Sequence, residues 1–79
     1  MPRIVRTAEE IQTIVEMRVD EIREVREDGD RIGIPVPQWH EPDEDGCNWS
    51  MNVLRNPGAH LQAVLFVIAA AQTQFNLPT

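Results

Sequence analysis

The segment from Pro57 to Thr79 contains no Asp, Glu, Lys or Arg, and this lack of charge constrains the fold more than any other feature of the chain. Asn56 followed by Pro57 has the residue types preferred at a helix N-cap and first helical position, so we expect a helix from there to about residue 75. On a helical wheel, apolar residues surround this helix. A helix that is apolar all round needs packing partners on both sides.

The two sides of this helix predict two different contacts. One side is expected to pack on the rest of the domain and carries Leu61, Val64, Leu65, Ile68 and Phe75. The opposite side carries Ala59, Ala63, Phe66 and Ala70. A chain of 79 residues has room for a single domain, residues 1–79, with too little structure to cover both sides. We therefore predict a homodimer in which these four residues form the interface.

A second helix is predicted near the start of the chain. Thr7 and Glu10 have the spacing of a capping box, which indicates a helix over residues 8–28, and Gly29 suits its C-terminal cap. Apolar residues recur at helical spacing and form one stripe: Ile11, Ile14, Val15, Ile22 and Val25. Arg18 falls within this stripe. Either its stem packs on the core while its guanidinium reaches solvent, or it forms a partly buried ion pair with a carboxylate.

Between the helices, the chain has the pattern of a β-hairpin. Residues 47–53 alternate strictly between apolar and polar side chains, which indicates a strand. Residues 41–46 are dense in turn formers, and the two prolines at 35 and 37 are typical of an edge strand. The predicted fold is therefore α+β: a helix–β-hairpin–helix (α-β-β-α) arrangement, with two helices packed on one face of a small antiparallel sheet.

A hairpin centred near Glu44 sets Trp39 opposite Trp49 and sorts the side chains onto two faces. The face under the helices is expected to hold Trp39, Trp49, Met51 and Val53. The other face is expected to hold Gln38, His40, Asn48, Ser50 and Asn52. These five are neutral hydrogen-bonding side chains, suited to recognising a peptide, a sugar or a protein partner. A solvated sheet face, or a dimer contact, would show the same pattern.

Charge and composition exclude several classes of partner. The formal net charge is −6, from 13 acidic and 7 basic residues, which disfavours nucleic acids and anionic membranes. The longest apolar run, residues 63–71, is about half the roughly 20 residues that a membrane-spanning helix needs. The single cysteine, Cys47, rules out an internal disulfide and suits a reducing compartment, so we expect a cytoplasmic protein.

Candidate catalytic or metal-binding residues are few. His40, Cys47 and His60, with Asp43, Glu44 and Asp45, match the spacing of no zinc or calcium motif, so neither metal nor cofactor is expected. Cys47 and His40 are also predicted to face opposite sides of the hairpin. The sequence therefore favours a small, non-enzymatic binding or accessory protein, a homodimer that acts through protein–protein interaction. The alternative is a small enzyme or metal-dependent module that uses His40 and Cys47.

Overall fold

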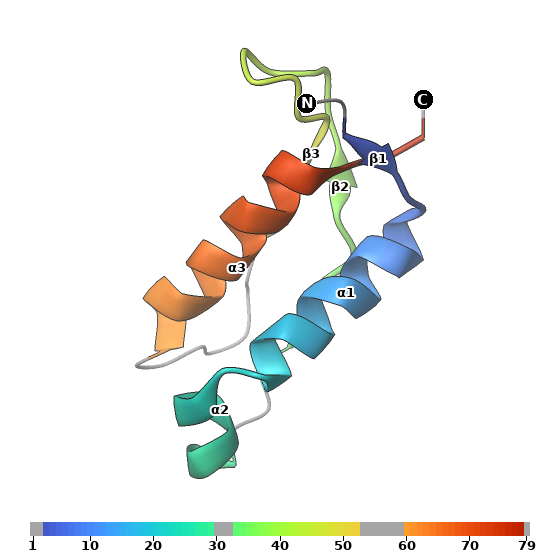
Figure 1. Cartoon of the computed structure of the whole chain (residues 1–79). Coiled ribbons are helices and arrows are strands. Elements are labelled where there is room, and N and C mark those ends of the chain that lie inside the picture. Colours follow the sequence, from blue (N-terminus) through green and yellow to red (C-terminus); the bar gives the residue numbers. More distant parts are fainter. Residues whose placement is uncertain (1–2, 30–32, 53–59, 79) are drawn as a thin grey trace.

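The computed structural model describes residues 3–29, 33–52 and 60–78 (Figure 1). Its elements, in chain order, are β1 (Ile4–Val5), α1 (Ala8–Asp20), α2 (Arg23–Asp28), β2 (Gln38–Trp39), β3 (Trp49–Ser50), α3 (Leu61–Gln74) and β4 (Phe75–Asn76). The mixture of helices and strands confirms the α+β prediction. The predicted helix–hairpin–helix order is matched only loosely, because the structure adds a third helix and a parallel strand pair.

The first predicted helix is present but divided. Ile22 is extended, with φ −66° and ψ 123°, so α1 ends before it and α2 begins after it. The last turn of α1 is closed by a bond from the Ile22 N–H to the Val19 carbonyl, three residues back, a geometry that tightens helix ends. Gly29 then ends α2 with φ 67°, as predicted, in the left-handed region that glycine adopts without steric cost.

The start of α1 is held by the predicted capping box. The Glu10 N–H donates to the Thr7 hydroxyl at 3.2 Å, and the Thr7 N–H donates to Glu10 Oε1 at 3.1 Å. The bond from the Thr7 N–H to the Glu10 carboxyl lowers the pKa of this group most strongly from its ordinary value of 4.5, and the Thr7 hydroxyl and the charge of Arg6 lower it further.

This lowered pKa predicts how the cap responds to acid. A carboxylate whose pKa is lower in the folded state stabilises the fold above its unfolded pKa, and this contribution is lost as the pH falls through the folded pKa. Replacing Thr7 by alanine removes the hydroxyl that helps to lower the Glu10 pKa, so this pKa should rise part of the way back toward 4.5. An NMR titration of the Glu10 side chain measures this shift. An identical pKa in the wild type and Thr7→Ala would contradict it.

Arg18 adopts an arrangement that neither interpretation of the sequence contained. Its guanidinium carbon lies 5.7 Å from the centroid of the Phe75 ring, within the range of a cation–π contact. Among the described residues, no carboxylate forms an ion pair with it. The half-buried Arg18 thus joins the end of α1 to the residue that follows α3.

The core lies where α1, α3 and the hairpin meet. α1 and α3 run side by side in opposite directions (Figure 1). The buried cluster draws on both helices, the hairpin and the segment after α3: Ile11, Val15, Val19, Ile34, Cys47, Trp49, Met51, Val64, Ile68, Ala71, Phe75 and Leu77. No described helix is both long enough and apolar enough to span a lipid bilayer.

The buried side of α3 differs from the predicted one. Val64, Ile68 and Ala71 are buried, whereas Leu61 and Leu65 are 40% and 42% exposed, so the prediction was wrong for these two leucines. The physical reason is that a helix with apolar residues all round has no polar face to fix its rotation. Helix α3 begins at Leu61, and the predicted cap at 56–57 lies outside the described residues.

Two small strand pairs complete the fold. Gln38 pairs with Ser50 and Trp39 with Trp49 in the antiparallel pair β2–β3, which confirms the predicted register. The second pair, β1–β4, is parallel, with Ile4 opposite Phe75, and was not predicted. It joins segments from opposite ends of the described chain.

The two tryptophans do not share an environment. Trp49 is fully buried, but Trp39 is 51% exposed, so the prediction that both lie under the helices was wrong for Trp39. Trp49 takes the inner position, where its indole Nε1 donates to the Phe75 carbonyl at 2.9 Å. Met51 is buried as predicted, and Val53 lies outside the described residues.

Candidate functional site

The five polar residues predicted to form one recognition surface do not share one environment. Gln38 and Asn52 are exposed, and His40 and Ser50 are half-buried. Asn48 is only 1% exposed, so the prediction that it faces outward was wrong. Strand alternation suggested an outward side chain, but a segment from beyond α3 covers this position.

Asn48 holds the segment after α3 through two side-chain hydrogen bonds, which we call the Asn48 clamp. Its Oδ1 accepts from the Leu77 N–H at 2.8 Å, and its Nδ2 donates to the Leu77 carbonyl at 2.8 Å. One side-chain amide thus satisfies both backbone groups of a residue in the C-terminal segment, as a neighbouring strand would. Asparagine is the shortest side chain that carries a donor and an acceptor together in this geometry.

Further side-chain bonds fasten the hairpin to the same segment. Gln72 Nε2 donates to the Trp49 carbonyl at 3.0 Å, and Asn76 Nδ2 donates to the Gly46 carbonyl at 3.0 Å. With the clamp and the Trp49 indole bond, these contacts fix the hairpin against the end of α3 and β4. Several hydrogen bonds from different elements therefore converge on this region, an arrangement suited to positioning a site.

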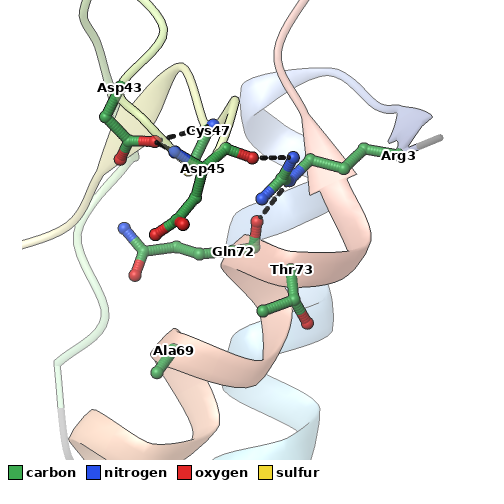
Figure 2. Close-up of a pocket in the computed structure, with 7 residues that line it drawn as sticks. All are labelled: Arg3, Asp43, Asp45, Cys47, Ala69, Gln72 and Thr73. Carbon is green, nitrogen blue, oxygen red and sulfur yellow. Dashed lines mark hydrogen bonds between the residues drawn. The ribbon is translucent and has the colours of Figure 1, made fainter. Parts of the chain in front are cut away.

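A pocket of about 590 Å³ lies at this junction, between the hairpin loop and the last turns of α3 (Figure 2). It is lined by Arg3, Asp43, Asp45, Cys47, Ala69, Gln72 and Thr73. Arg3 spans the junction: its Nε donates to the Gln72 carbonyl at 2.8 Å and its Nη1 to the Asp45 carbonyl at 2.6 Å. Arg3 was not predicted as a site residue, because only the parallel β1–β4 pair brings it next to the hairpin.

The loop that forms one wall of the pocket is closed by its own residues. Asp43 Oδ1 accepts from the N–H groups of Asp45 and Cys47, at 2.9 and 3.1 Å. Gly46 has φ 89°, a conformation that disfavours any other residue, and a Cβ there would stand 2.9 Å from Arg3 Nη1. Glycine thus allows both the turn and the approach of the guanidinium.

His40 and Cys47 are engaged separately. The buried Cys47 Sγ donates to the Trp49 carbonyl at 3.2 Å, whereas His40 Nδ1 lies 2.6 Å from the Glu41 carbonyl oxygen. Cys47 lines the pocket, and His40 is not among its lining residues. Across residues 3–29, 33–52 and 60–78, no group of three or more His, Cys, Asp or Glu side chains is arranged to hold a metal ion.

A second candidate site is the outer side of α3, which we call the α3 surface: Leu61, Leu65 and Phe66. All three are exposed, and Phe66 is 76% exposed. Two other members of the predicted dimer interface, Ala63 and Ala70, are half-buried beside Phe66, and Ala59 lies outside the described residues. An exposed apolar side is therefore present on α3, but it includes leucines that were expected in the core.

Comparison of the chain with protein-family models, curated proteins and solved structures gave no match. Two features of the structure can carry a function: the pocket and the α3 surface. The pocket offers charged groups, whereas the α3 surface offers apolar area without charge.

Proposed function

We propose that the chain is a small, non-enzymatic, cytoplasmic binding protein that forms a homodimer and acts through protein–protein interaction. The α3 surface is the observation that supports this proposal. Phe66, Leu65 and Leu61 expose apolar area along one helix that carries no formal charge. Fully burying an exposed side chain of this size stabilises a contact by about 1.5–3 kcal/mol, so Phe66, which is 76% exposed, contributes most and the two leucines, at 40% and 42%, add a smaller share.

The lack of charge on α3 makes a second copy a suitable occupant of the α3 surface. Two molecules with a net charge of −6 repel each other, and a charged contact surface would add like charges at close range. The α3 surface avoids this cost, because an uncharged side meets its own copy in a two-fold contact. Phe66, the most exposed large apolar side chain in the described part of the chain, would anchor such a contact.

The polar side chains of the hairpin remain a proposed contact for another protein. Gln38, His40, Ser50 and Asn52 are each at least partly exposed, and none carries a formal charge at neutral pH. They lie on the hairpin, away from the α3 surface in the chain, so dimerisation and partner binding would use separate elements. Asn48 is no longer part of this proposed surface.

Phe66→Glu is expected to convert a dimer into a folded monomer. The substitution puts a charge at the centre of the contact but leaves the core untouched, because Phe66 is 76% exposed. Sedimentation at micromolar concentration should show a dimer for the wild type and a monomer for the variant. The wild-type Tm should also rise with concentration, whereas the Tm of the variant should not.

Met17→Glu is the matched control. Met17 is 58% exposed on α1, so it introduces the same charge at an exposed apolar position on the other long helix. It should leave the dimer intact. A wild-type chain that sediments as a monomer, with a Tm independent of concentration, would contradict the homodimer.

A further inference from the structure

Two opposite charges face the pocket without pairing. Arg3 uses Nε and Nη1 on backbone carbonyls, and within the described part of the chain its Nη2 has no hydrogen-bond partner. The Asp45 carboxylate likewise forms no hydrogen bond or ion pair with the described residues, although Arg3 touches the carbonyl of the same residue. The pocket therefore presents a free donor and a free carboxylate that do not neutralise each other.

The guanidinium is held in place by neighbouring groups. Arg3 is fixed between two carbonyls that belong to different elements, one in α3 and one in the hairpin loop. The Asp45 backbone is fixed by its N–H, which donates to Asp43 Oδ1 at 2.9 Å, while its carboxylate is exposed. Figure 2 shows the Arg3 guanidinium and the Asp45 carboxylate on different sides of the pocket. A ligand that entered would meet a preorganised guanidinium, which reduces the entropy lost on binding.

The remaining lining suits a small organic ligand. Ala69 is a small apolar side chain, and the Thr73 hydroxyl, which donates to the Ala70 carbonyl at 2.7 Å, keeps its lone pairs available as acceptors. The volume of about 590 Å³ lies within the range of small-molecule sites, which span roughly 300–1,000 Å³.

We propose that this pocket binds a small zwitterion of the α-amino-acid class. The ligand carboxylate accepts from Arg3 Nη2, and the ligand ammonium donates to the Asp45 carboxylate. The ligand side chain lies toward Ala69. A ligand with a single charge would satisfy only one of the two protein groups, and charge-assisted hydrogen bonds are the strongest contacts available here.

NMR titration of the full chain with L-alanine tests the proposal. At constant ionic strength, the amide resonances of Asp45, Ala69 and Thr73 should shift and saturate. Ethylamine and propionate each carry one of the two charges, and each should bind at least roughly tenfold more weakly, since one lost charge-assisted bond is worth more than 1.4 kcal/mol. The absence of saturable shifts, or equal binding of either single-charge compound, would overturn it.

Variants identify the two charges. Asp45→Asn removes the carboxylate charge but keeps the backbone carbonyl that Arg3 contacts, so the fold is retained and L-alanine binding should weaken at least roughly tenfold. Arg3→Gln should weaken it similarly. Glu44→Gln removes the same charge from the same loop at a residue that does not line the pocket, and should bind normally. Unchanged binding by Asp45→Asn would overturn the proposal.

The site does not depend on dimerisation, so Phe66→Glu should also bind L-alanine normally.

Discussion

Replacing Asn48 by leucine is expected to destabilise the protein by about 2–6 kcal/mol. Leucine is similar in size but cannot bond to the Leu77 N–H or carbonyl, which would both stay buried without a partner. Each unsatisfied buried group costs roughly 1–3 kcal/mol, so losing both gives the expected range. Urea unfolding followed by circular dichroism measures the difference in free energy of unfolding.

Two further variants distinguish the loss of the Asn48 hydrogen bonds from the general effect on stability of replacing an asparagine. Asn48→Asp keeps the acceptor for the Leu77 N–H but sets a carboxylate against the Leu77 carbonyl, so it too should be strongly destabilising. Asn52→Leu makes the same change at an exposed asparagine four positions along and should shift the free energy of unfolding by less than about 0.5 kcal/mol. Similar stabilities for Asn48→Leu and Asn52→Leu would show that the clamp is not formed.

Trp49→Ala is expected to cost about 3–5 kcal/mol, the usual range for removing a large buried aromatic side chain. Trp49 is fully buried, and its loss would also leave the Phe75 carbonyl without the indole donor. For a small domain this equals most of the total stability, so the variant should be largely unfolded. Trp49→Phe refills much of the volume and isolates the hydrogen bond, so its smaller loss should be measurable by chemical denaturation.

Trp39 provides the matched control on the opposite strand. It pairs with Trp49 in register but is 51% exposed, so Trp39→Ala should be tolerated. In the wild type, a soluble quencher should reach one indole and not the other. Equal quenching of both rings, or equal destabilisation by the two alanine variants, would contradict this placement of the tryptophans.

Local signals in the sequence predicted the local structure well. The capping box at Thr7, the left-handed cap at Gly29 and the hairpin register around Trp39 each depend on a few neighbouring residues, and each is confirmed. Residues only a few positions apart determine such features, because a helix cap or a tight turn is stabilised by groups that are close in the sequence.

Features that depend on distant segments were not predicted. The inward position of Asn48 depends on its bonds to Leu77, and the position of Arg3 depends on the β1–β4 pair. Strands of two residues are too short to show a periodic pattern in the sequence, so neither contact could be predicted. The rotation of α3 was wrong at Leu61 and Leu65 because every side of that helix is apolar. Of the candidate site, the sequence therefore indicated the apolar helix and the acidic loop, and gave no sign of the guanidinium that completes the pocket.

The parallel pair β1–β4 also bears on the order of folding. Arg3 meets Gln72 across 69 positions, and the Arg6 N–H donates to the Asn76 carbonyl at 2.9 Å nearby. Such pairing has to close almost the whole described chain into one loop, and contacts of this separation slow the search for the native state. The helices and hairpin can form from local contacts, whereas the strand pair joins segments that meet once α3 has packed against α1. We therefore expect the junction that builds the pocket to assemble late in folding, and to depend on both ends of the described chain.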